Sequence, residues 1–246
     1  MKITLFVPCY VDQCMPEIGQ SVVHVLEKLG HQVEFDPRLV CCGQPAFNTG
    51  CWAEARSVAE SVVRRLENVE AVVVPSGSCA AMIRVFYQEL FHGHPVAGMA
   101  HNLSKRTYEF SELLVDVLKV TDLGAQFPAK ITFHDGCHGL RELHVKDQPR
   151  RLLAAVKGLE LVELEDHEVC CGFGGMFSVK FPMISDAMGK TKCTNAEATG
   201  ADYLVSNDPS CLLHLRGYLS RQKSPMKVLH LAQVLDCDYS KKWTLK

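Results

Sequence analysis

Eight of the twelve cysteines in this chain form two matched sets of four. Each set has a lone cysteine, then an adjacent pair followed by glycine, then another lone cysteine. The lone cysteine precedes the pair by 32 residues in one set and 33 in the other, and the last cysteine follows the pair by 37 and 40 residues. The first set is Cys9, Cys41, Cys42 and Cys79, and the second set is Cys137, Cys170, Cys171 and Cys211.

Four thiolates per set indicate a metal site. Thiolates select zinc, copper(I) or iron–sulfur clusters, and four is the ligand number of both structural zinc and a [4Fe–4S] cluster. Structural zinc commonly uses two short C-x(2–4)-C loops, which neither set contains, since Ser76 and Asp208 stand three residues before the last cysteines. Adjacent cysteines diverge and could reach two iron atoms. We therefore predict one or two iron–sulfur clusters, most simply [4Fe–4S], with zinc as the alternative.

Other residues near the cysteines have simpler interpretations. A single Cys-Cys pair is commonly just two small buried apolar residues, and it is the repeated spacing that favours metal here. His134, Asp135 and His138 surround one lone cysteine and are candidate proton donors, although no catalytic residue is assigned. We expect Met176, Phe177 and Phe181 to belong to the core.

The elements that would position these cysteines alternate between strand and helix. Hydrophobic patterns predict strands at 3–7, 32–35, 71–74, 131–134, 161–164 and 203–206. They predict helices at 17–29, 52–66, 80–90, 149–156, 182–198 and 212–220, with packing helices at about 101–119 and 228–236. This order predicts an α/β fold of two pseudo-symmetric βαβ lobes, 1–125 and 126–246, with short parallel sheets flanked by helices. Because every matched cysteine follows a strand, each set should gather at the carboxyl edge of its sheet.

Composition excludes several classes of partner. The 26 basic and 28 acidic residues give a net charge of -2 without long runs of one sign, so nucleic acid is not an expected partner. No apolar stretch is long enough for membrane insertion, and we expect a cytoplasmic protein. Thiols stay reduced in that compartment, so twelve cysteines indicate metal or redox chemistry rather than disulfides.

Two copies of Cys, Cys-Cys-Gly and a later Cys resemble the cysteine-rich CCG-domain family. That family includes heterodisulfide reductase B and the iron–sulfur subunits of glycolate oxidase and anaerobic glycerol-3-phosphate dehydrogenase. The chain is most similar to the lactate-utilisation type through these segments: Val7-Pro8-Cys9-Tyr10-Val11-Asp12, Cys41-Cys42-Gly43-Gln44-Pro45-Ala46-Phe47-Asn48, Pro75-Ser76-Gly77-Ser78-Cys79 and Cys170-Cys171-Gly172-Phe173-Gly174-Gly175.

The resemblance implies an iron–sulfur electron-transfer subunit of a cytosolic complex that oxidises L-lactate to pyruvate. Its partners would be the other subunits of a lactate-utilisation or glycolate oxidase-like complex, and the chain would not be a complete enzyme alone. No flavin or nicotinamide motif is recognisable, which agrees with that role. The alternatives are a heterodisulfide reductase-like thiol/disulfide redox subunit and a zinc-stabilised structural protein.

The chain departs from heterodisulfide reductase B at one point. That protein carries C-x-x-C at the end of each repeat, which gives five cysteines and a non-cubane cluster that cleaves disulfides. Ser76 and Asp208 replace the first cysteine of that motif here. The type of cluster, cubane or non-cubane, therefore stays open.

Overall fold

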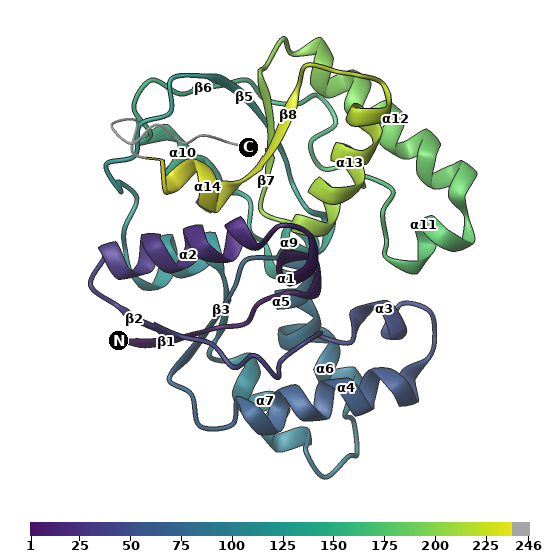
Figure 1. The fold of residues 1–246 in the computed structure, drawn as a ribbon. Coiled ribbons are helices and arrows are strands. Elements are labelled where there is room, and N and C mark those ends of the chain that lie inside the picture. The colour runs from purple at the N-terminus through teal and green to yellow at the C-terminus, as the bar shows by residue number, and fades with distance from the viewer. Residues whose placement is uncertain (238–246) are drawn as a thin grey trace.

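The computed structural model describes residues 1–237, which form two four-stranded parallel sheets (Figure 1). The first sheet contains β1 (Lys2–Leu5), β2 (Gln32–Glu34), β3 (Ala71–Val74) and β4 (Thr107–Glu109), in the order β2-β1-β3-β4. The second contains β5 (Lys130–His134), β6 (Glu160–Leu161), β7 (Tyr203–Ser206) and β8 (Lys227–His230), in the order β6-β5-β7-β8. The same order in both sheets confirms the predicted α/β fold of two similar lobes.

Helices connect and cover the strands in both lobes. The first lobe contains α1 (Cys9–Cys14), α2 (Pro16–Lys28), α3 (Gln44–Phe47), α4 (Trp52–Arg65), α5 (Gly77–Ala81), η1 (Met82–Phe86), α6 (Tyr87–Leu90), α7 (Ala97–Ser104), α8 (Phe110–Glu112) and η2 (Leu113–Val117). The second contains α9 (Cys137–Leu143), α10 (Asp147–Ala154), α11 (Met176–Lys180), α12 (Pro182–Ala198), α13 (Pro209–Arg221) and α14 (Leu231–Leu235). The segments η1 and η2 are π-helical turns that continue α5 and α8.

The two predicted packing helices are wrong in part, because each segment overlaps the fourth strand of its sheet. Thr107–Glu109 forms β4 between α7 and α8, and Lys227–His230 forms β8 immediately before α14. An edge strand of three or four residues is too short to show strand alternation beside a helical pattern. Its pairing with the neighbouring strand determines the structure instead.

A shared hydrophobic core lies between the two sheets. It combines side chains of both halves, including Val22 and Leu113 from the first and Leu153 and Val234 from the second. Helix α2 packs against α14, and α10 packs against α8 and η2, so helices of the two lobes pack against one another between the sheets (Figure 1). Because this core crosses residue 125, the proposed division into 1–125 and 126–246 stays a prediction.

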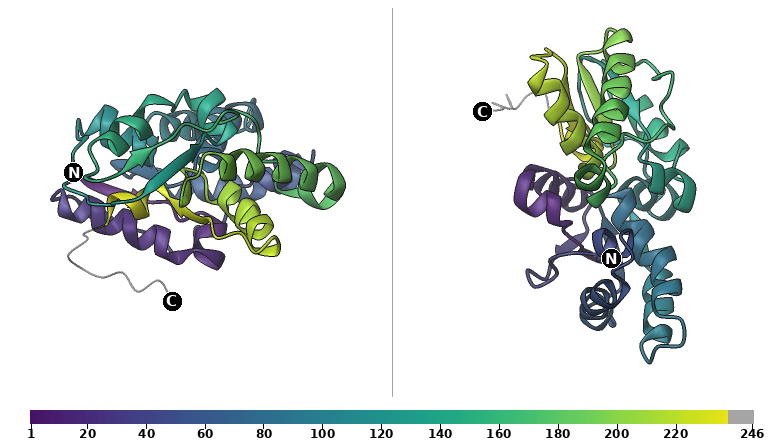
Figure 2. Two further views of the ribbon diagram at one scale, coloured as in Figure 1. Left: turned by 90° about the horizontal axis from the view of Figure 1, so that it is seen from above. Right: turned by 90° about the vertical axis from the view of Figure 1, so that its right-hand side faces the viewer.

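The outer faces of the sheets have separate cores. Side chains of α4, α5, η1, α6 and α7 cover β3 in the first lobe, and α12 and α13 cover β7 in the second. Figure 2 shows the lobes arranged one after the other along the long axis of the molecule. No helix in the described residues is both long and apolar enough to span a membrane.

Candidate metal centre

The first cysteine set comes together at the carboxyl edge of the first sheet. Cys9 begins α1 just after β1, Cys41 and Cys42 precede α3, and Cys79 lies in the first turn of α5. The Sγ atoms of Cys42 and Cys79 are 3.3 Å apart. Thiol hydrogen bonds also join Cys41 to Cys42 and to Cys9. The four sulfur atoms therefore form one contiguous group.

The second set repeats this arrangement on the second sheet. Cys137 begins α9 after β5, and Cys211 lies in the first turn of α13. Thiol hydrogen bonds join Cys170 to Cys137 and to Cys171, and Cys171 in turn to Cys211. The structure thus brings together each of the two sets that the spacing predicts.

The first cysteine of each set lies in more regular structure than the sequence predicts. The sequence indicates loops around Cys9 and Cys137, but each residue begins a helix. Helices of six and seven residues are too short to show a clear amphipathic pattern. Beginning a helix directly after a strand fixes each thiol at the sheet edge.

The thiols are electrostatically coupled within each set. Hydrogen bonds from Cys42 and Cys9 lower the pKa of Cys41 to about 3. The hydrogen bond to Cys41, followed by burial, raises the pKa of Cys9, and Cys137 behaves in the same way toward Cys170. One thiolate per set is thus stabilised by protonated neighbours, while four thiolates together would need positive charge. A multivalent metal centre supplies such charge, so the donor set fits one.

The glycine after each cysteine pair has a steric reason. Gly43 and Gly172 have φ values of +85° and +91°, in a region where residues with side chains are strained. The backbone nitrogen of each glycine lies 3.4 Å from the sulfur of the first cysteine in its pair. A Cβ at Gly172 would lie 2.8 Å from the carbonyl oxygen of Ser185 in α12, and one at Gly43 would lie 3.0 Å from that of Ala55 in α4. Glycine therefore lets each cysteine turn pack against a helix backbone.

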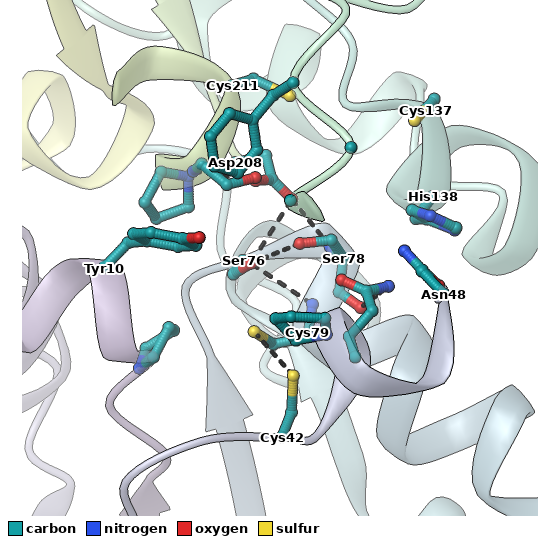
Figure 3. Close-up of a pocket in the computed structure, with 18 of the residues that line it drawn as sticks. Tyr10, Cys42, Asn48, Ser76, Ser78, Cys79, Cys137, His138, Asp208 and Cys211 are labelled. Atoms are coloured by element: carbon teal, nitrogen blue, oxygen red, sulfur yellow. Dashed lines mark hydrogen bonds between the residues drawn. The ribbon is translucent and has the colours of Figure 1, made fainter. Parts of the chain in front are cut away.

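Both sets open on one cleft between the lobes (Figure 3). Seven of the eight matched cysteines line it, all except Cys41. The cleft is also lined by Ser76 and Asp208, which occupy the positions where a fifth cysteine would stand. The two candidate centres thus share one solvent-facing space.

Helix contacts across the cleft follow an approximate two-fold. Helix α5 packs against α9, and α1 packs against α13. Because α1 corresponds to α9 and α5 to α13, exchange of the lobes turns one contact into the other. Gly77 and Gly139 lie at the first contact, where a Cβ on Gly77 would be 2.9 Å from the Cα of Gly139. These glycines allow the cysteine-bearing helices of the two lobes to touch.

Asp208 is the N-cap of α13 and also joins the lobes. Its Oδ1 accepts from the Ser210 N–H at 3.0 Å, and its Oδ2 accepts from the Ser78 N–H of the first lobe at 2.8 Å. The Ser76 hydroxyl donates to the same Oδ2 at 3.4 Å. The capping role could be predicted from the sequence, whereas the contact to the other lobe has no local signal.

Replacing Asp208 with alanine should therefore destabilise the metal-free chain by about 2 kcal/mol, because two backbone N–H groups lose their partner. Asp208→Asn retains one acceptor oxygen and should cost less. Urea unfolding of the metal-free variants measures both effects. Equal stability of the wild type and Asp208→Ala would contradict the bridging role.

The candidate proton donors lie in different environments. Asp135 is buried and ion-paired, 2.9 Å from an Arg150 nitrogen and 2.6 Å from the His167 Nδ1. His138 lines the cleft and meets the Phe86 ring edge-on. His134 is fully buried beside the second cysteine set.

Two further expectations concern single residues. Met176 and Phe181 are not core residues as predicted, because both are exposed on α11 and at its end. The unmatched cysteines lie outside the two groups of sulfur atoms. Among them Cys14 and Cys51 are exposed, while Cys193 of α12 is buried.

Comparison with known families agrees with this architecture. The model of the cysteine-rich CCG domain matches residues 3–84 and again residues 131–216, one match per lobe. The chain therefore belongs to the cysteine-rich CCG-domain family.

Curated relatives match over almost the whole chain. It is 46% identical to Lactate utilization protein A of Geobacillus kaustophilus (strain HTA426) and 45% identical to Lactate utilization protein A of Bacillus pumilus (strain SAFR-032). Each match covers 96% of this chain and 99% of the relative. A crystal structure of a hypothetical protein from Helicobacter pylori has a TM-score of 0.64, with 13% identity over 95% of this chain and 48% of its own. At that identity the likeness concerns the fold alone.

Proposed function

We propose that this chain is the iron–sulfur electron-transfer subunit of a cytosolic complex that oxidises L-lactate to pyruvate. The observation that carries the proposal is the convergence of two sets of four cysteines on a single cleft. Relatives named for lactate utilization, matched from end to end, support the choice of substrate.

In this proposal each set holds one cluster. Cys9, Cys41, Cys42 and Cys79 would bind the first, and Cys137, Cys170, Cys171 and Cys211 the second. A bound [4Fe–4S] cluster supplies a site that gains and loses a single electron. The fold buries Cys42, Cys79, Cys171 and Cys211, whereas Cys9, Cys137 and Cys170 line the cleft and are only partly buried.

Oxidation of the lactate hydroxyl to a ketone releases two electrons and two protons. The group that accepts them from lactate would belong to a partner subunit, and this chain would pass the electrons on. Exposed apolar residues on α11 and α12 support such an assembly, since Met183 is 87% and Val179 68% exposed. Contiguous apolar surface of this kind marks interaction sites.

Anaerobic co-purification followed by lactate-dependent dye reduction tests the proposal. We expect the chain to reduce no dye with lactate on its own, and the assembled complex to do so. Lactate oxidation by the isolated chain would overturn the subunit role. Reduction of disulfides without partners would favour the heterodisulfide reductase-like alternative.

A zinc-stabilised protein is the second candidate. The donor atoms of His134, Cys171 and Cys211 lie within 4.8 Å of one another, close enough to approach a single ion. Zinc in near-stoichiometric amount, without iron or sulfide, would favour this candidate.

A further inference from the structure

His134 is a buried side chain without a protein partner. Its exposed fraction is 0%, and neither ring nitrogen has a hydrogen-bond partner among the described residues. A ring nitrogen lies within 4.8 Å of the Sγ atoms of both Cys171 and Cys211. Because unpaired buried polar atoms are costly, this ring is well placed to bond a group that occupies the space among the thiols.

The first lobe has phenylalanine at the corresponding position. Phe6 stands three residues before Cys9, as His134 stands three residues before Cys137. The strand pairing gives the same match. The Phe6 N–H donates to the Val73 carbonyl of β3, and His134, at the end of β5, lies alongside β7, the strand that corresponds to β3. Phe6 is also 0% exposed. An apolar ring thus replaces an N–H donor in an otherwise repeated site.

A buried ammonium adds to this difference. Lys192 of α12 is 2% exposed, the only lysine or arginine buried to that degree in residues 1–237. Its Nζ donates to the carbonyl of Asp166, and it lines a small hollow together with Cys170. Two carboxylates are buried in this lobe as well. Asp208 contacts both lobes, and Asp135 is neutralised by its ion pair with Arg150.

We infer that His134 donates its ring N–H to a sulfur atom of the second centre and gives that centre a higher reduction potential than the first. The inference rests on the proposed function, in which each set holds an iron–sulfur cluster. Four cysteines already supply the four ligands, so the ring acts as a donor rather than as a ligand. Hydrogen bonds and positive charge near a cluster favour its reduced, more negative state, which raises the potential.

This difference in potential gives electron transfer between the two centres a preferred direction. Electrons shared between the two sets rest preferentially at the second lobe, with Cys137, Cys170, Cys171 and Cys211. The first lobe, whose buried polar residues include no cation, is then the lower-potential side.

A redox titration of the full chain, loaded anaerobically and followed by electron paramagnetic resonance, tests this inference. We expect two potentials in the wild type. His134→Phe, which copies the first lobe, should lower the higher potential by about 59 mV, equivalent to a tenfold change in the ratio of reduced to oxidised centre. His134→Gln retains an N–H donor and should recover part of the shift. His230→Asn, at another fully buried histidine of the same lobe, should leave both potentials unchanged.

Hyperfine spectroscopy of the wild type, labelled with ¹⁵N-histidine and exchanged into D₂O, gives a readout independent of variant folding. An exchangeable proton weakly coupled to the second centre, together with a weak histidine nitrogen coupling, supports the donor. A strong coupling typical of nitrogen bound to iron would overturn it.

Iron and sulfide analysis separates the two proposals. Loaded centres whose potentials do not respond to His134→Phe would overturn this inference alone. Absence of iron and sulfide from the wild type would overturn the proposed function together with the inference.

Discussion

Replacing Cys42 or Cys171 with serine should remove the cluster of the substituted half and lower the iron content of the chain by roughly half. Each residue is buried at the centre of its set, between two other thiols. Serine is a poorer ligand for iron than a thiolate, and the remaining three cysteines cannot complete the site. Iron and acid-labile sulfide, measured after anaerobic reconstitution, give the result directly, and electron transfer in the assembled complex should fall with them.

The matched control is Cys193→Ser. Cys193 is fully buried in the second lobe but lies outside both sets. The Cys193→Ser variant should lose a similar amount of stability, because it also buries a hydroxyl, but it should retain its iron. If Cys42→Ser and Cys171→Ser keep as much iron as Cys193→Ser does, the matched cysteines are not the ligands.

The Gly77→Ala substitution should destabilise the metal-free chain by about 3 kcal/mol, toward the upper end of the cost of overpacking. The new methyl group would lie 2.9 Å from the Cα and 3.1 Å from the nitrogen of Gly139. Backbone atoms cannot rotate away as a side chain can, so α5 and α9 would have to separate. Urea unfolding measures the loss of stability, and reconstituted iron should fall as well because both helices carry cysteines.

Gly217→Ala is the control for this prediction. Gly217 lies within α13, and a Cβ there meets nothing within 4 Å. Alanine in an exposed helix interior should stabilise the chain by up to about 1 kcal/mol. Equal effects of the two substitutions would contradict the close approach of the lobes at Gly77.

Much of this architecture could be predicted because the chain repeats itself. Two matched cysteine sets at nearly constant distances identify the same local structure twice, and β3, α2 and α4 have hydrophobic patterns strong enough to locate them. The positions of Cys79 and Cys211 in first helical turns follow from the strand that precedes each of them.

The features that were missed depend on contacts between distant segments. Strands β4 and β8 form by pairing with β3 and β7, and no local pattern of their own distinguishes them. In the sequence Lys192 resembles any surface lysine of a helix, and its burial depends on how α12 packs beside the second cysteine set. The contact of Asp208 with Ser78 joins residues 130 positions apart. The Gly77–Gly139 contact depends on how the lobes meet.

The measurement that tests the central claim most directly is metal and sulfide analysis of the wild-type chain after anaerobic reconstitution. We predict iron and acid-labile sulfide in equal amounts, roughly four of each per occupied cysteine set, with one or both sets filled. A chain that binds near-stoichiometric zinc, and neither iron nor sulfide under the same conditions, would contradict the iron–sulfur account.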